Sequence, residues 1–259
     1  MKKTIIKVTA VLFLTTLTSC GIDMLNRVEG NNNVTSIKRD ISTDFTKVRV
    51  STGIELFIQQ GSKISLTVEA DENLHDIIIT EVVDGKLKIY TEKNIWKSAA
   101  KKVYLTVNTI EELTASSGSI VVSESVLKAT NLDVSSSSGA NLTIEVAATN
   151  LISSTSSGSS SQIEANTTSV ISTSSSGSSL NLSGETTSHE TSASSGSSIT
   201  AYKLISKDVI AKVSSGASIS VYASSSIDGK ASSGGGISFE GSPKKVTKNT
   251  SSGGRVSPR

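Results

Sequence analysis

The sequence predicts an all-β fold, a right-handed parallel β-helix (a β-solenoid) with coils of about 19–21 residues. Three observations predict it: the triplet Ser-Ser-Gly recurs eight times, apolar residues stand at fixed offsets from each glycine, and no helical period is present. The intervals between successive glycines are 21, 19, 19, 19, 20, 18 and 19 residues, and such a period indicates stacked repeats. The glycines, which we predict to be structural turn residues, are Gly118, Gly139, Gly158, Gly177, Gly196, Gly216, Gly234 and Gly253.

The offsets from the glycine predict strands on both sides of it. The third residue after the glycine is apolar in every repeat except at Ser161, and the fourth is nearly always polar. This alternation is typical of a strand with one buried face. Seven residues before the glycine most repeats have Leu, Val or Ile. We therefore expect two short strands per coil, joined at Ser-Ser-Gly and buried by stacking, since a single coil buries too little to be stable.

Glycine at the bend predicts a positive φ, and serines in a vertical row can pass hydroxyl hydrogen bonds from coil to coil. A flexible Ser/Gly linker and a leucine-rich or helical repeat are the alternatives. The linker lacks apolar residues in phase, and the excess of Ser, Thr, Val and Ile does not fit the helical repeats.

Residues 1–19 read as a lipoprotein signal peptide, with three lysines and then a short apolar run. Leu17-Thr18-Ser19-Cys20 resembles the bacterial lipobox, which predicts lipidation of Cys20, the only cysteine, and a membrane partner through that anchor. Gly21 gives no signal for retention at the inner membrane, so we expect the outer membrane, on its periplasmic or its surface face. The alternative is an ordinary signal peptide with an incidental cysteine.

The remaining chain divides into three parts. Residues 20–36 are polar and predict a tether that follows the lipidated cysteine. Residues 37–112 alternate strongly without the serine repeats, which predicts the first coils of the solenoid or a cap over its end. Residues 113–259 form the Ser-Ser-Gly repeats.

Three runs in the second part resemble a known family. They are Phe45-x-x-Val48-x-Val50-x-x-Gly53-Ile54-x-Leu56-x-Ile58-x-Gln60-Gly61, Glu69-Ala70-Asp71-Glu72-x-Leu74 and Asp84-Gly85-x-Leu87-x-Ile89. Together with the Ser-Ser-Gly coils they are similar to the family called putative auto-transporter adhesin, head GIN domain, over about residues 40–255. The resemblance implies a right-handed β-helix in an exported protein or lipoprotein of Bacteroidetes, with adhesion as its role. It implies no catalytic or binding residues.

Charge and motifs exclude several function classes. Without the signal peptide the chain has 22 basic and 23 acidic residues, a net charge of −1, so no basic field attracts nucleic acid. No nucleophile motif, metal motif or phosphate loop is present, so we expect neither an enzyme nor a cofactor. The two histidines, His75 and His189, are expected at the surface.

One set of residues is a candidate binding site. Six residues after the glycine stand Glu124, Glu145 and Glu164, and the same offset later gives Tyr202 and Tyr222. In-phase coils would place these residues in one column, which could bind a divalent cation or form a shallow glycan-binding face. The alternative is a row of turn residues in water.

The sequence therefore predicts a non-enzymatic lipoprotein of the cell envelope, an adhesin or a structural surface protein with a glycan or a protein as ligand. The main alternative is a carbohydrate-binding or carbohydrate-active β-helix, because paired carboxylates are also the groups of glycosidases. An envelope-stress or assembly factor stays open as a third class.

Overall fold

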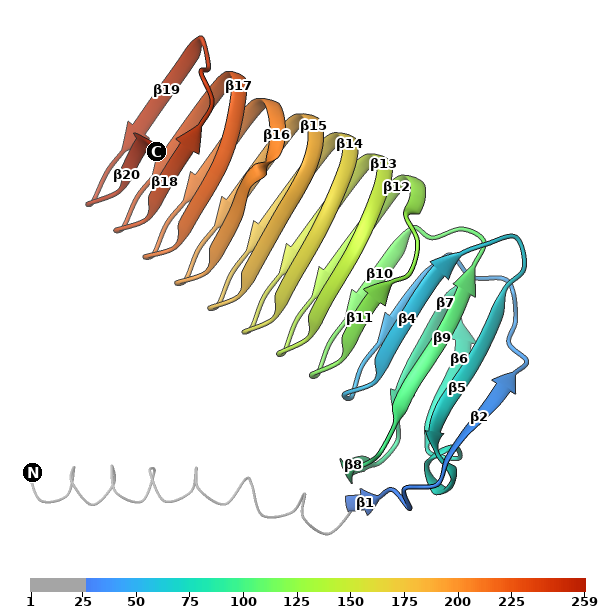
Figure 1. The fold of residues 1–259 in the computed structure, drawn as a ribbon. Helices are drawn as coiled ribbons and strands as arrows, with labels where there is room; N and C mark the ends of the chain where they lie inside the picture. Colours follow the sequence, from blue (N-terminus) through green and yellow to red (C-terminus); the bar gives the residue numbers. More distant parts are fainter. Residues whose placement is uncertain (1–26) are drawn as a thin grey trace, which may run out of the picture.

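The structure is a computed structural model that describes residues 27–259. The predicted signal peptide and Cys20 lie outside the described residues. Within 27–259 the chain has strands and one 3-10 turn, η3 (Glu72–Leu74), but no α-helix. No helix in this part of the chain is long and apolar enough to cross a membrane. The predicted all-β class and parallel solenoid are confirmed, with strands stacked in a long row (Figure 1).

The coils of the repeat region stack in parallel, with equivalent residues opposite one another. Leu142 lies opposite Ser161, for example, and Leu151 opposite Val170. The strands are β12 (Leu127–Ser136), β13 (Asn141–Thr155), β14 (Ser160–Ser174), β15 (Ser179–Ala193), β16 (Ser198–Val213), β17 (Ser218–Ala231), β18 (Gly236–Glu240), β19 (Lys245–Thr250) and β20 (Arg255–Pro258).

The expectation of two short strands per coil is corrected by β13 to β17, where each coil is one strand of 14–16 residues. The strand bends in its middle, opposite the Ser-Ser-Gly corner, and its backbone keeps pairing through the bend. In β13 the buried residues run to Val146 and resume at Leu151, so the alternation changes phase there. We call the half after the glycine the first arm and the half before the next glycine the second arm.

The corners are tight turns that require glycine for its backbone angle. At the eight triplets the second serine has φ of 47–54° and the glycine φ of 67–77°. Two consecutive positive φ values define a type I′ turn. At Gly158 nothing lies within 4 Å of the place where a Cβ would stand, so the conformation and not the space selects glycine. The Gly158 N–H donates to Ser176 O of the next coil at 3.1 Å.

The residue that follows each corner glycine supplies the buried row of hydroxyl groups, and the Ser-Ser pair before the glycine does not. The Ser159 hydroxyl lies 3.0 Å from Ser136 O and 2.7 Å from Ser156 O, and it accepts the Ser156 N–H at 3.2 Å. Ser178 repeats this arrangement one coil later. These hydroxyls satisfy backbone groups that the corner would otherwise bury without partners.

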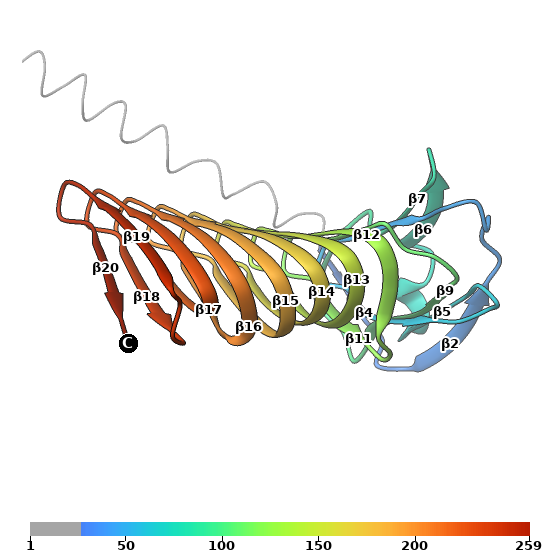
Figure 2. The ribbon, with the colours of Figure 1, turned by 90° about the horizontal axis from the view of Figure 1, so that it is seen from above.

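The N-terminal part supplies both a first coil and a cap. β3 (Lys47–Val50) and β4 (Glu55–Gln60) flank a further type I′ corner at Thr52-Gly53, with φ of 61° and 70°. They pair in parallel with β10 (Glu112–Ala115) and β11 (Ile120–Ser123). The segment between these two coils, together with the strand that precedes β3, forms the cap, seen at the blue and green end of Figures 1 and 2.

On the first arm the cap consists of β9 (Lys101–Val107), β5 (Ser65–Asp71) and β2 (Val34–Arg39), the last two antiparallel to their neighbours. On the second arm it is the hairpin of β6 (Ile78–Val83) and β7 (Lys86–Thr91). A separate two-stranded ribbon joins β1 (Arg27–Glu29) to β8 (Asn94–Lys97). In the described residues, β1 and the start of β2 thus lie inside the stretch 20–36 that the sequence predicts to be a tether.

The interior is aliphatic at the N-terminal end and becomes polar in the middle coils. Buried residues near the cap include Leu56 and Leu105, whereas Ser153, Ser172 and Thr191 fill equivalent inward positions of β13 to β15. The prediction that both histidines lie at the surface is wrong. His75 is 5% exposed and His189 is 1% exposed, because both stand at inward positions of the fold.

Candidate functional site: the outer face of the first arm

One outward column runs along the first arm from β5 to β20 without interruption, and on β2 the residue in register with it is Lys38. Each member lies in register with the next across neighbouring strands. We call it the face column, and its members are Thr67, Tyr104, Phe57, Val122, Thr143, Gln162, Asn181, Thr200, Ser220, Ser238 and Ser257. None of these side chains carries a charge, and from Thr143 onward every one can donate and accept hydrogen bonds. Parallel strands lie about 4.8 Å apart, so the column is a regular ladder of hydrogen-bonding groups.

The N-terminal end of the face column is aromatic. The rings of Phe57 and Tyr104 stack with their centroids 5.2 Å apart and an angle of 17° between planes. Both side chains are half-buried, so part of each ring faces the solvent. Stacked aromatic rings beside hydroxyl and amide groups present an apolar platform next to hydrogen-bonding groups. This combination matches the two kinds of surface that a sugar ring exposes.

A bulge interrupts the first arm at Tyr202. The coil between Gly196 and Gly216 has one residue more than the usual 19, and β16 accommodates it by a shift in register. Thr200 lies opposite Asn181, but Lys203 lies opposite Ser183. Bulges re-aim the side chains they contain.

A hollow of about 240 Å³ forms where the bulge meets the face column. Polar residues of three coils line it together with the Tyr202 ring and the buried Leu182, and they are Gln162, Asn181, Ser183, Thr200 and Lys203. The Arg259 guanidinium lies 4.8 Å from the centroid of the Tyr202 ring and bonds Glu240 at 3.1 Å. The hollow thus combines amide and hydroxyl groups with an aromatic ring, one face of which is covered by Arg259.

The bulge also separates the residues that the sequence placed in one acidic and aromatic column. Glu145 and Glu164 lie in register, but Glu164 is followed by Ser183, and Tyr222 pairs with Ile205 and Glu240 instead of Tyr202. Glu124 lies just beyond the end of β11. All three glutamates are exposed. No group of three or more His, Cys, Asp or Glu side chains that could hold a metal occurs in residues 27–259.

The paired carboxylates also lack a cleft. Glu145 and Glu164 are exposed on neighbouring coils, and neither lines the hollow at Tyr202. A glycosidase encloses the scissile bond between its two carboxyl groups. The pair therefore gives no support to the carbohydrate-cleaving alternative.

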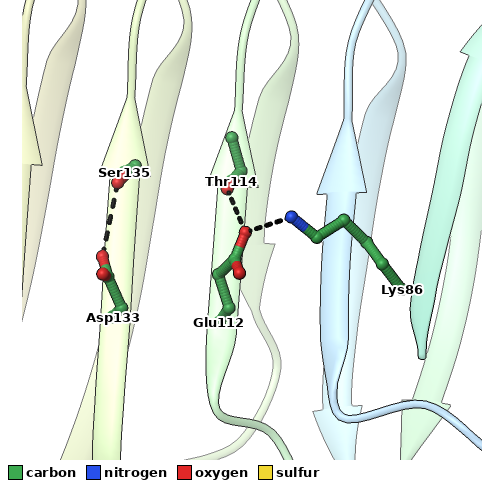
Figure 3. A network of polar contacts seen from close by, with 5 residues as sticks. All are labelled: Lys86, Glu112, Thr114, Asp133 and Ser135. Carbon is green, nitrogen blue, oxygen red and sulfur yellow. Dashed lines mark hydrogen bonds and ion pairs between the residues drawn. The ribbon is translucent and has the colours of Figure 1, made fainter. Parts of the chain in front are cut away.

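The outer face of the second arm is charged at its N-terminal end. The Lys86 ammonium of β7 donates to Glu112 Oε1 of β10 at 2.6 Å, and Thr114 donates to the same oxygen at 3.2 Å (Figure 3). The hydrogen bond from Lys86 is the main cause that lowers the pKa of Glu112. On the next coil Ser135 donates to Asp133 at 3.4 Å. The Lys86–Glu112 ion pair ties the cap to the repeats across β3.

Farther along the second arm lies a hollow that the sequence analysis missed. It has a volume of about 450 Å³, and its lining includes Ile171 and Ile210, which are 42% and 43% exposed. The acidic groups of Glu190, Asp208 and Asp228 also line it. The available signal was the position six residues before the glycine, where isoleucine replaces the polar residue of other repeats.

Comparisons with known proteins agree on the fold. The sequence profile of the family described as "Putative auto-transporter adhesin, head GIN domain" matches residues 44–170 and 155–243. A similar crystal structure is a putative adhesin from Parabacteroides distasonis, 18% identical, with a TM-score of 0.85 over 90% of this chain and 100% of that chain. Another is a putative adhesin from Parabacteroides merdae, 19% identical, with a TM-score of 0.83 over 90% and 99%.

A third similar structure, from Parabacteroides distasonis, is described as a putative lipid binding protein. It is 20% identical, with a TM-score of 0.84 over 90% of this chain and 99% of that chain. At these identities the three likenesses show a shared fold. The comparison with curated proteins gives no match.

Proposed function

Since the chain belongs to the putative auto-transporter adhesin, head GIN domain family, we propose that it is an exported, non-enzymatic adhesin whose ligand is a glycan. The observation that carries the proposal is the face column, an uncharged ladder of hydroxyl and amide groups with the Phe57–Tyr104 stack at one end. Hydroxyl-rich ligands are recognised by such groups with little desolvation of charge.

The location that we propose is the outer membrane, through a lipid on Cys20. The lipobox resemblance of residues 17–20 supports it, and the family supports export. Mass spectrometry of the protein from cells should find acyl chains on Cys20. Protease treatment of whole cells would then tell the surface face from the periplasmic face, and an unmodified Cys20 would contradict the anchor.

A pair of matched double variants tests the contact surface. Gln162→Lys with Thr200→Lys places two bulky charges on the face column, and Ser154→Lys with Thr173→Lys places two on the outer face of the second arm. Gln162 and Thr173 are exposed and Ser154 and Thr200 are half-buried, so all four sites accept a lysine without core rearrangement. Binding to glycan arrays and to matrix-coated surfaces is the measurement.

We expect the face-column variant to lose at least tenfold in glycan binding while the control variant binds like the original chain. Equal binding by both variants would contradict the proposed contact surface. Release of reducing sugar by the purified protein would contradict the non-enzymatic part and favour the carbohydrate-active alternative.

A further inference from the structure

The ribbon of β1 and β8 lies at the end of the fold where the described chain begins (Figure 1). It presents an exposed aromatic side chain. Trp96, the only tryptophan of the protein, is 65% exposed on β8. The Arg27 guanidinium of β1 lies over its ring, 4.4 Å from the centroid. An exposed tryptophan is costly in water, since burial of its ring is strongly favourable.

The ribbon is held rigidly by one buried carboxylate. Asp71, which is 0% exposed, accepts the N–H groups of Asn32, Ala99 and Ala100, each at 3.0 Å. Asn32 follows β1, and the two alanines follow β8, so both strands are fastened to the same side chain. The Gly30 N–H also donates to Lys97 O at 2.8 Å. The backbone of the ribbon, and with it the place of Trp96 at this end of the fold, is therefore fixed by hydrogen bonds.

The ribbon and its flanks carry more basic than acidic side chains, the exposed acids being Glu29 and Glu92. Arg27, Lys93 and Lys97 are exposed on or beside the ribbon. A hollow of about 450 Å³ adjoins β8, and Lys93 and Lys101 line it together with one acid, Glu92, and the hydroxyl-bearing Thr52 and Ser117, so its charged groups are mainly basic. Cations and hydroxyl donors around a hollow suit the phosphate group of a lipid.

The length of the chain before the ribbon limits its distance from a lipid on Cys20. Arg27 is the seventh residue after Cys20, and even a fully extended chain of that length spans no more than about 25 Å. The ribbon would thus lie within that distance of the bilayer. Tryptophan, arginine and lysine are the side chains that favour the interface of a bilayer with water.

We propose that the β1–β8 ribbon is a membrane-contact site, with Trp96 placed among the headgroups of an anionic bilayer and Arg27, Lys93 and Lys97 bound to lipid phosphates. The proposal rests on the lipid-anchored location proposed above. This contact gives the anchored solenoid a defined orientation relative to the membrane, because it holds the cap end against the membrane surface in addition to the lipid anchor.

Trp96 itself is the probe for the test. A chain that begins at residue 20 and carries Cys20→Ser has no acyl anchor but retains every residue that the structure describes. It is mixed with vesicles of phosphatidylethanolamine and phosphatidylglycerol or of neutral phosphatidylcholine. We expect a blue shift of Trp96 emission, and quenching by brominated lipid, with the anionic vesicles. Unchanged emission with them would overturn the proposal.

Two variants separate the contact from the anchor. Trp96→Ala with Arg27→Glu should lower the fraction that floats with anionic vesicles at least tenfold, whereas Ile210→Ala with Lys230→Glu, on the exposed second arm, should leave it unchanged. Equal flotation of both variants would refute the ribbon as the contact. If Cys20 proves to be unacylated in cells but Trp96 still responds to vesicles, the anchor fails and the membrane-contact site stands.

Discussion

Replacing His189 by leucine should remove an acid-sensitive position from the middle of the solenoid. His189 stands on β15 in an inward column, between Val170 and Val209 of the neighbouring coils. Its Nε2 lies 2.9 Å from the Ser172 hydroxyl, which donates its own proton to Thr191. The proton of the neutral ring is thus assigned to Nε2, and Nδ1 has no partner.

Burial lowers the pKa of His189 from 6.5 to about 4, because a second proton would sit on the unpartnered, buried Nδ1. A histidine with a lowered folded pKa stabilises the fold only above its unfolded pKa, and this contribution is lost as pH falls from about 6.5 toward 4. Between pH 7.5 and pH 5 the loss amounts to about 2 kcal/mol. For a chain of this size that corresponds to a fall in Tm of about 4–8 °C.

The measurement is thermal unfolding of both proteins at pH 7.5 and pH 5. Leucine is close to histidine in volume, and Ser172 keeps its hydrogen bond to Thr191, so the variant should fold. We expect His189→Leu to lose at least 4 °C less than the original chain on acidification. Carboxylates titrate in both proteins alike, so the difference isolates the histidine. Equal losses in Tm would refute the reasoning.

Three further predictions concern single contacts. Asp71→Asn should destabilise the fold by roughly 2–4 kcal/mol in urea unfolding, since an amide cannot accept all the N–H groups that the carboxylate accepts. Gly184→Ala should cost more than about 3 kcal/mol, because its Cβ would lie 2.2 Å from a carbonyl oxygen of the neighbouring coil. Lys248→Leu should cause concentration-dependent association, measured by light scattering. Lys248 lies 5.5 Å from the Phe239 ring on the exposed last coil, and its charge opposes pairing of that edge with another chain.

The predictions for Gly184 and Asp71 each have an internal control. Gly158→Ala, in open space at φ of 69°, should cost only about 1 kcal/mol, so equal costs at Gly158 and Gly184 would contradict the steric argument. Burial alone would raise the pKa of Asp71, but three backbone N–H groups lower it overall. In the original chain its stabilisation should therefore be complete above the unfolded pKa of about 3.9 and be lost as pH falls below that value, and it should be absent from Asp71→Asn at neutral pH.

The repeat phase made most of the solenoid predictable. Once the glycine is the origin, the third position after it is inward in every coil from Val121 to Ile237, including Ser161. The same phase would have placed His189 inside, because it stands seven residues before a glycine where other repeats have aliphatic residues. The polarity of histidine favours the surface, but its position in the repeat determines that it is buried.

The cap and the ribbon could not be read from the repeats. The corner at Thr52-Gly53 is followed in the stack by the corner at Gly118, whose preceding Ser117 accepts the Gly53 N–H. The interval of 65 residues from Gly53 to Gly118 hides the coil from a search at a period of 19. The pairing of β1 with β8 joins residues 27–29 to residues 94–97, and such short strands carry no register signal of their own.

The sequence predicts which positions of the first arm face outward, but not which of the predicted residues share one column. A period of 19 puts the fourth residue after each glycine outward, and this column is unbroken. The column predicted at the sixth position after the glycine does not form, because the extra residue in the Gly196–Gly216 coil makes a bulge that shifts the register. The interval of 20 signals an insertion, but sequence alone does not say where in the coil the bulge falls.

Hydroxyl groups inside the middle coils bear on how the solenoid fixes its register. Aliphatic columns supply burial energy but discriminate weakly between registers, since Leu, Val and Ile fit one another's places. The Ser136 and Ser161 hydroxyls lie 2.7 Å apart, and those of Ser172 and Thr191 lie 2.9 Å apart, all of them buried. A slipped register would leave these hydroxyls unpaired at about 1–3 kcal/mol each. The polar interior thus penalises misalignment of the coils, and alignment is the condition on which the continuous outer ladder depends.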